Sequence, residues 1–353
     1  MQNFCIDLHN GGPIIYNDIL KEYAQKNIHK YNINELIQNI NRYRAELLIS
    51  QQYPEYKNAW IKSNLDIAIR TVGIFSENAF SAKAINRDLN LIKNLCSSVE
   101  WLEIVTSYKD ILECKKNRKK GYLLMIESLE GIVNNLEDFL CSEIKIVQPV
   151  YNYSNSIGGG CFDKADCGLT DLGRNIIHNL CKKNIIIDYS HVGEKTSFDI
   201  LNENPIHNIA THTLSAELTQ SPRAKSDFFL KGLKESGGFV AITLNPNFYP
   251  LSNESMEISF LKQLEHLIAL LGEDCIGIGT DWDGPMPDFL VCGLADAAAQ
   301  LKNNTYSLSI KNDFYNGMID WSRIMQSIES NFGKKVAEKV CGNNALSFFE
   351  RHL

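Results

Sequence analysis

Residues 184–191 of the chain read Asn-Ile-Ile-Ile-Asp-Tyr-Ser-His, a short apolar run that ends in polar residues. A run this short, apolar at consecutive positions, is typical of a strand that is covered on both faces. Several other segments share this composition. Strands are therefore predicted at residues 4–8, 121–126, 144–150, 184–188, 208–211, 238–244 and 275–279.

Amphipathic stretches lie between these apolar runs. Residues 169–183 and 259–271 carry apolar side chains at helical spacing, and Thr170 or Asp171 is suited to cap the first helix. Strands that alternate with helices predict an α/β fold with a parallel sheet. The pattern alone does not separate a closed barrel from a doubly wound sheet. The side chains expected on the buried helix faces are Leu172, Ile176, Ile177 and Leu180 in the first, and Phe260, Leu264, Ile268 and Leu271 in the second.

The bulk composition is that of an ordinary globular protein, with 353 residues, 44% of them hydrophobic and 22% charged. No internal repeat and no linker rich in proline, glycine or serine interrupts the chain, so a single domain over residues 1–353 is predicted. The formal net charge of -7 argues against a nucleic-acid partner, because phosphate neutralisation needs a basic face.

The ten cysteines are scattered and form no CxxC pair, which argues against a thiolate zinc ribbon or a thioredoxin-type site. They are expected to act mostly as small buried hydrophobes in a reducing, cytoplasmic compartment. The sequence shows no basic-then-apolar leader and no apolar run of 18 residues, so no membrane partner is predicted.

Polar side chains follow five of the predicted strands. In parallel α/β folds, ligands and catalytic groups gather at the C-terminal edge of the strands. Imidazole and carboxylate groups suit Zn²⁺ and neighbouring divalent ions, and such a site lowers the pKa of a bound water towards about 7. The sequence therefore predicts a metal centre. Its candidate residues are His9, Glu127, His191, His212 and Asp281.

Each of these residues is also open to a structural interpretation. A lone histidine after a strand is more often a satisfied polar residue than a ligand, and a lone carboxylate often caps a helix. Joint occurrence after five apolar runs favours the metal centre. No GxSxG elbow is present, and the glycines at 158–160 lack the GK[ST] of a phosphate loop. The remaining histidines are expected at the surface or in packing: His29, His178, His207, His266 and His352.

A series of motifs adds a resemblance to this reading. The chain carries, in order, Ile-Asp-Leu-His-Asn at 6–10, Ile-Glu at 126–127, Gly-Leu-Thr-Asp-Leu-Gly at 168–173, Ile-Asp-Tyr-Ser-His-Val at 187–192, Gly-Ile-Gly-Thr-Asp-Trp-Asp-Gly at 277–284 and Cys-Gly-Asn-Asn-Ala at 341–345. The series resembles the successive signatures of the membrane (renal) dipeptidase family. The resemblance implies a (β/α)8 TIM-like barrel of the metal-dependent hydrolase type. It also implies a two-metal centre, usually zinc, that cleaves dipeptides, and a homodimer.

The resemblance also implies roles for individual residues. His9 would bind a first metal, Glu127 would bridge two metals, and His191 and His212 would bind the second. Asp281 would act as the acid/base that takes a proton from water and passes it to the leaving amine. Arg223 would hold the substrate carboxylate, which suits its planar, bidentate guanidinium.

Two positions depart from the family pattern. Where the family has an aspartate that binds the first metal, this chain has Gly11, so a zinc centre of one or two ions is expected. Asp7 lies further back on the same strand face and is not expected to replace the missing ligand. Tyr151 stands where mammalian-type members have a histidine that contacts the substrate carbonyl, and resembles a Tyr-Asn variant of bacterial members. Its hydroxyl is able to donate to a developing oxyanion.

Three functions follow as hypotheses. The first is a metal-dependent dipeptidase that acts on a small peptide or peptide-like substrate. The second is a tailoring enzyme that acts on a peptide-like metabolite with the same scaffold, as the loss of a ligand at Gly11 suggests. The third is a non-catalytic ligand-binding relative, which the retention of five polar strand-end residues disfavours. Residues 285–309 are expected to form loops near the site.

Overall fold

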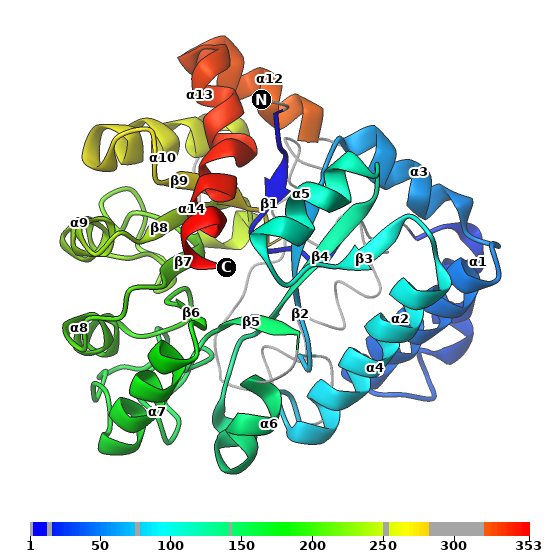
Figure 1. Cartoon of the computed structure of the whole chain (residues 1–353), viewed down its shortest axis with the longest axis horizontal. Helices are drawn as coiled ribbons and strands as arrows, with labels where there is room; N and C mark the ends of the chain where they lie inside the picture. The colour runs from blue at the N-terminus through cyan, green and yellow to red at the C-terminus, as the bar shows by residue number, and fades with distance from the viewer. Residues whose placement is uncertain (1–2, 13–15, 75–77, 141–142, 250–253, 282–320) are drawn as a thin grey trace.

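The computed structural model describes residues 3–12, 16–74, 78–140, 143–249, 254–281 and 321–353. Eight parallel strands form a nearly closed barrel with helices around it, in the order β1-β2-β4-β5-β6-β7-β8-β9 (Figure 1). A hydrogen bond from the Leu8 amide to the Ile278 carbonyl, 2.9 Å long, links the two ends of this order. The predicted (β/α)8 TIM-like barrel is therefore confirmed.

Each of the seven predicted strands overlaps a strand of the barrel, although β4 begins one residue earlier and β7 ends two residues later than predicted. The sequence missed two further strands, β2 and β3, because their apolar runs are only a few residues long and include charged side chains. β3 pairs with the first residues of β4, outside the barrel order. The strands are β1 (Ile6–Asp7), β2 (Ile67–Thr71), β3 (Leu102–Ile104), β4 (Lys120–Ile126), β5 (Ile144–Val147), β6 (Ile186–Asp188), β7 (Asn208–Thr213), β8 (Phe239–Thr243) and β9 (Ile276–Gly279).

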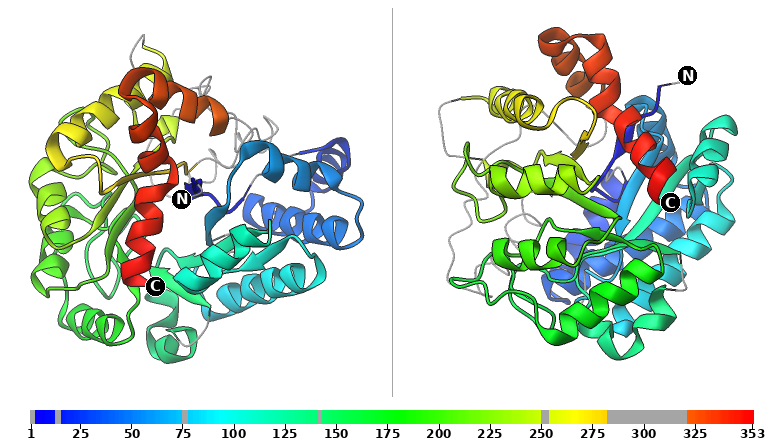
Figure 2. Two further views of the ribbon diagram at one scale, coloured as in Figure 1. Left: turned by 45° about the horizontal axis from the view of Figure 1, so that its top comes forward. Right: turned by 60° about the vertical axis from the view of Figure 1, so that its left-hand side comes forward.

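Helices cover the outside of the barrel, and three of them lie between β1 and β2. Figures 1 and 2 show α1 to α4 gathered on one side of the molecule. The helices are α1 (Asp18–Asn27), α2 (Ile33–Ile49), α3 (Pro54–Ser63), α4 (Ala82–Ser98), α5 (Tyr108–Lys116), η1 (Glu130–Asn135), α6 (Leu136–Leu140), α7 (Asp171–Lys182), α8 (Glu194–Asn202), α9 (Asp227–Glu235), η2 (Pro246–Phe248), α10 (Met256–Leu271), α12 (Trp321–Phe332), α13 (Lys334–Glu338), η4 (Lys339–Asn343) and α14 (Asn344–His352).

Both predicted helices are present, with one error on the apolar face of α7. Thr170 caps α7, since its side chain accepts a hydrogen bond from the Gly173 amide. Leu172 was predicted to be buried, which is wrong: it is 42% exposed, and Gly173 occupies the core-facing position instead. On α10, Leu267 is fully buried while Ile268 is only partly buried.

The interior of the barrel is filled by side chains that point inward from its strands, such as Ile69, Met125 and Phe239. Phe348 on α14 joins this cluster, with its ring 5.4 Å from that of Phe239, which begins β8. α14 therefore lies against the N-terminal mouth of the barrel and leaves the C-terminal mouth for the site.

Within the described residues, no helix combines the length and the apolar character needed to cross a membrane. Residues 285–309, predicted to form loops near the site, lie outside the described residues.

Candidate metal centre and its cavity

The five predicted strand-end residues meet at the C-terminal mouth of the barrel. His9, Glu127, His191 and Asp281 follow β1, β4, β6 and β9, and His212 lies within the last residues of β7. Because all barrel strands are parallel, their C-terminal ends share one mouth. The structure therefore brings together all five residues that the sequence singled out as metal-centre candidates.

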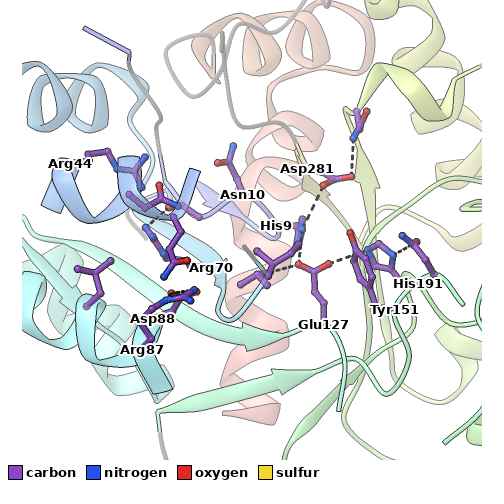
Figure 3. A pocket seen from close by; sticks show the side chains of 18 of the residues that line it. His9, Asn10, Arg44, Arg70, Arg87, Asp88, Glu127, Tyr151, His191 and Asp281 are labelled. Carbon is purple, nitrogen blue, oxygen red and sulfur yellow. Dashed lines mark hydrogen bonds and ion pairs between the residues drawn. The ribbon is translucent and has the colours of Figure 1, made fainter. Parts of the chain in front are cut away.

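The ligand atoms form two groups. Those of His9, His212 and Asp281 lie within 4.8 Å of one another, as do those of Glu127, His191 and His212. The Nε2 atom of His191 is 3.1 Å from both Glu127 Oε2 and His212 Nε2. His9 Nε2 lies 3.5 Å from Glu127 Oε1 and 3.6 Å from Asp281 Oδ1 (Figure 3). Glu127 thus faces both groups, and Asp281 is a further potential ligand beside His9.

Burial determines the charge of this cluster. Desolvation lowers the pKa of His9 to about 3 and lowers the pKa values of His191 and His212 well below the ordinary range. Desolvation also raises the pKa of Glu127 to about 8, although the hydrogen bond from Thr71 lowers this pKa. The imidazoles are therefore neutral at pH 7 and keep a lone pair for a cation.

The remote nitrogen of each imidazole has a partner of its own. His191 Nδ1 lies 2.7 Å from Asn152 Oδ1, and His212 Nδ1 lies 2.7 Å from Thr211 Oγ1. His9 Nδ1 contacts the sulfur of Met125 at 3.3 Å. Since an amide oxygen accepts a hydrogen bond, the Asn152 contact places the proton of His191 on Nδ1 and leaves Nε2 free to bind metal. Such outer partners orient the ligands of zinc sites, so the donor set fits a zinc-like divalent ion.

Two buried aspartates hold the strand ends that carry the ligands. Asp188 accepts hydrogen bonds from the amides of Ser190 and Thr211, at 3.1 and 2.9 Å, and from both hydroxyls. Asp7 accepts from the amides of His9 and Thr280, at 3.1 and 2.9 Å, and from the Thr280 hydroxyl. Both aspartates therefore hold the backbone of the strand ends, and the hydrogen bonds of Asp7 go to His9 N and Thr280.

Gly11 lies at the edge of the cluster in a left-handed backbone conformation, with φ +87°. Its carbonyl accepts a hydrogen bond of 3.1 Å from Arg70 Nη1, and a Cβ atom at Gly11 would lie 3.4 Å from Arg70 Cγ. The first atom of any side chain at position 11 would therefore be in van der Waals contact with Arg70.

Asp281 is also held in a left-handed conformation, with φ +50°. Its amide donates to the His9 carbonyl over 2.7 Å, and Asn245 Nδ2 donates to its Oδ2 over 3.2 Å. These contacts turn Oδ1 toward His9. Non-glycine residues rarely adopt positive φ, and observed cases cluster at functional sites.

Arg223 and Tyr151 lie on the His191 side of the cluster. Arg223 is 3% exposed, its Nε donates to the Ser190 carbonyl over 3.2 Å, and its guanidinium lies 4.9 Å from the centre of the Phe248 ring. Its Nη2 atom is buried and makes no hydrogen bond to the described residues. Tyr151 stacks on His191 with ring centroids 4.3 Å apart. Arg223 thus keeps a donor for a ligand.

These groups open into a cavity of about 780 Å³ (Figure 3). His9, Glu127, Tyr151, His191, Arg223 and Asp281 line it, while His212 is fully buried behind them.

Sequence reasoning missed the residues that support the site. Thr71 donates to Glu127, Asn152 contacts His191, and Asn245 donates to Asp281. Asn152 was part of the quoted Tyr-Asn motif, and Asn245 directly follows the strand predicted at 238–244, so strand-end position was an available signal for both. Thr71 ends β2, which the sequence did not predict.

Comparison with known proteins finds relatives in sequence and in fold. The sequence profile of the membrane dipeptidase family (peptidase family M19) matches residues 2–308. An uncharacterized protein in the pqqA 5' region of Klebsiella pneumoniae is 24% identical over 259 residues, which cover 69% of this chain and 95% of that protein.

Two solved structures share the fold. An amidohydrolase from Pseudomonas aeruginosa superposes with a TM-score of 0.76 at 24% identity, covering 98% of this chain and 95% of that one. A metallo peptidase from Rhodobacter sphaeroides, liganded with a phosphinate mimic of the dipeptide L-Ala-D-Ala, superposes with a TM-score of 0.72 at 17% identity over the full length of both chains.

Proposed function

The chain belongs to the membrane dipeptidase family, and we propose that it is a metal-dependent dipeptidase that hydrolyses the peptide bond of dipeptides. The observation that carries the proposal is the buried cluster of three neutral imidazoles and two carboxylates beside Arg223, whose Nη2 has no partner among the described residues. The dipeptide mimic bound to the Rhodobacter sphaeroides metallo peptidase supports the substrate class.

The proposed cofactor is zinc, in one or two ions per chain. His9 and Glu127 would hold one ion, and Glu127, His191 and His212 would hold the other. A divalent ion in such a site supplies a Lewis acid that acidifies water and polarises a peptide carbonyl.

The side chains of this chain would then position the substrate and move its protons. Arg223 binds the terminal carboxylate through Nη2, with Phe248 and the Ser190 carbonyl fixing its plane. Asp281 Oδ1 takes a proton from the attacking water and returns it to the leaving amine, while Asn245 holds Oδ2. The hydroxyl of Tyr151 donates to the oxygen on which negative charge develops.

Metal content per chain and hydrolysis of a dipeptide panel test the proposal together. The full chain is equilibrated with zinc, freed of excess, and assayed by elemental analysis and for hydrolysis with Zn²⁺, Mn²⁺ and Co²⁺. One or two bound ions and hydrolysis are expected. Asp281→Asn should lower kcat by about 10²- to 10⁴-fold with substrate KM little changed. A metal-loaded chain that cleaves no dipeptide would contradict the proposal.

The tailoring-enzyme hypothesis is the second candidate. Two observations together favour it. Gly11 has no side chain that could bind a metal, and the cavity of about 780 Å³ extends well beyond the candidate metal ligands. A peptide-like metabolite larger than a dipeptide would occupy that space. Hydrolysis of dipeptides at rates far below those of longer amides would favour it.

The remaining predictions concern the surroundings of the enzyme. We infer a reducing, cytoplasmic compartment from the scattered cysteines and a homodimer from the family resemblance. Fractionation of cells that express the chain tests the compartment, and light scattering of the purified protein tests the dimer.

A further inference from the structure

The cavity has a second half that lies away from the candidate metal ligands and is rich in arginine. α2, β2 and α4 contribute four arginines to its lining and a single aspartate, Asp88. In Figure 3, Arg44, Arg70 and Arg87 lie on one side of His9, while Tyr151 and His191 lie on the other. We call Arg42, Arg44, Arg70 and Arg87 the arginine group.

Arg44 is the most informative member of this group. It is 4% exposed, its guanidinium lies 5.6 Å from the centre of the Tyr56 ring, and its Nη1 makes no hydrogen bond to the described residues. A buried guanidinium is costly unless an anion or an acceptor compensates it. Because Arg44 lines the cavity, a ligand that enters the cavity is able to supply that acceptor.

Arg70 is the member of the arginine group that lies beside the candidate metal ligands. Its Nη1 donates to the Gly11 carbonyl over 3.1 Å and to the Tyr122 hydroxyl over 3.4 Å, and its guanidinium packs over the Tyr122 ring. These contacts hold the cation beside the backbone that carries His9. An anion bound at Arg70 is therefore next to the proposed reaction centre.

The other charges of this region leave the surplus positive. Asp88 is shared between Arg87, at 2.8 Å, and the amide of Gly73, also at 2.8 Å. Arg42 lies at the exposed rim, 3.7 Å from Glu46. The described lining contains no other carboxylate on this side of the cavity. Arg44 and Arg70 therefore make no ion pair with a carboxylate among the described residues, although the charge of Asp88 also acts on Arg70.

Amide side chains surround the arginine group and make this half of the cavity hydrophilic. They accept and donate hydrogen bonds without adding charge. A ligand part that fits here is polar and anionic, unlike an aliphatic side chain, which would leave these groups unpaired. The amides are Gln38, Asn39, Asn41, Asn90 and Asn94.

We propose that the arginine group is a second anion-binding subsite, which receives an anionic oxygen group, carboxylate or phosphate, from the N-terminal part of the substrate. This rests on the proposed function, in which Arg223 holds the C-terminal carboxylate on the opposite side of the metal cluster. A substrate held by Arg223 extends its N-terminal residue past His9 toward Arg70 and Arg44. The preferred substrates are thus peptides or peptide-like compounds with an acidic N-terminal residue or acyl group.

Matched dipeptides test this inference on the zinc-equilibrated full chain. Glu-Ala is compared with the isosteric, neutral Gln-Ala, and phosphoserine-Ala with Ser-Ala. We expect kcat/KM to be at least about tenfold higher for the charged member of one pair, as bonds to a charged group predict. The pair that shows the larger ratio identifies carboxylate or phosphate as the preferred group. Equal kcat/KM within both pairs, with hydrolysis retained, overturns the subsite and leaves the proposed function standing.

Variants tie the preference to the residues. Arg44→Met and Arg70→Met should reduce the charged-to-neutral ratio to near one, and Arg44→Lys should keep part of it because the charge remains. Arg174→Met, which removes an arginine on α7 outside the cavity, is the matched control and should keep the full ratio. A ratio that survives both methionine variants contradicts the assignment.

Binding without catalysis separates the two proposals. Glutarate and inorganic phosphate are added to the metal-free full chain, and the shift in melting temperature is measured. A ligand that binds only the folded state raises that temperature. A rise that is lost in Arg44→Met and Arg70→Met, but not in Arg174→Met, supports the subsite even if no dipeptide is cleaved. A rise that all variants share, or no rise with either anion, overturns it.

Discussion

Asp188 lies directly behind the metal-ligand cluster without lining the cavity. Five donor atoms from three residues point at its carboxylate, including Gln148 Nε2 at 2.5 Å and the Thr211 hydroxyl at 2.6 Å. The same Thr211 oxygen contacts His212 Nδ1, and the Ser190 hydroxyl oxygen accepts a hydrogen bond from the His212 amide. The carboxylate therefore orients His212 through both its side chain and its backbone.

Asp188→Asn should weaken metal binding. The new side-chain amide nitrogen would face hydrogen-bond donors in place of a carboxylate oxygen, so the contacts that orient His212 would be lost. Loss of such an outer partner typically lowers metal affinity about 10- to 100-fold. Chelator competition measures the change. Asp66→Asn is the control, since this buried aspartate accepts from the Cys5 amide and Lys115 at the opposite end of the barrel. Equal metal affinity in the wild type and Asp188→Asn would show that Asp188 does not orient the ligands.

Gly11 lends itself to a direct test of metal number. Gly11→Asp supplies the carboxylate that the family pattern has, while Gly11→Asn imposes the same backbone strain at φ +87° without the charge. We expect about one more zinc per chain in Gly11→Asp than in Gly11→Asn, measured by elemental analysis. If the two variants bind the same amount of metal, the new carboxylate pairs with the adjacent Arg70 instead.

The C-terminal Gly-Asn segment is a structural element, located at the opposite end of the barrel from the metal-ligand cluster. The Asn343 side chain accepts a hydrogen bond from the Phe4 amide, and Asn344 donates to the carbonyls of Glu273 and Ile276. Gly342 packs so closely that an added Cβ would lie 2.2 Å from the Phe4 carbonyl oxygen. This segment therefore fastens the residues before β1 and β9, whose far ends carry His9 and Asp281.

Gly342→Ala should lower the free energy of unfolding by about 1–3 kcal/mol, because the new methyl group collides with backbone that cannot move without shifting β1. Urea unfolding measures the change. Gly232→Ala, in the interior of α9, is the comparison: its methyl group meets only the end of the Leu201 side chain at 3.2 Å. That variant should change stability by less than about 1 kcal/mol. Similar losses in both variants would argue against the collision at Phe4.

At the scale of the whole molecule, a pair of histidines far from the metal-ligand cluster is expected to make the free energy of unfolding depend on pH. His207, before β7, and His352, at the end of α14, place their Nδ1 atoms 3.0 Å apart. One of the two nitrogens must be unprotonated to accept the hydrogen bond. Burial, then His207 and Arg351, lowers the pKa of His352 to about 4, and burial lowers the pKa of His207.

A lowered folded-state pKa of a base means that the unfolded chain binds more protons between pH 4 and 6.5. The free energy of unfolding should therefore fall as the pH drops below 6.5 and be fully present above it. His352→Gln should make the urea midpoint less sensitive to a change from pH 7 to pH 5. His29→Gln, at an exposed position, should leave the sensitivity unchanged. An equally steep decline in His352→Gln would rule out this pair as the cause.

Much of the site was predictable because it depends on local patterns. Consecutive apolar residues mark strands that are buried on both faces, and parallel strands bring their C-terminal ends to one mouth. Those two rules suffice to collect His9, Glu127 and Asp281 from positions more than 100 residues apart. That residues 1–353 form a single domain also follows from the sequence pattern and stays a prediction.

The arginine group could not be found in this way. Arg44 and Arg87 lie on helices, where an arginine that faces a cavity has the same spacing as one that faces solvent. Arg70 ends a strand whose apolar run is too short to recognise. Their placement depends on how α2 and α4 pack together beside β2, and such packing arises from contacts between residues distant in sequence. The sequence thus specified the fold and the strand-end positions of the candidate metal ligands, while tertiary packing set the size and charge of the cavity around them.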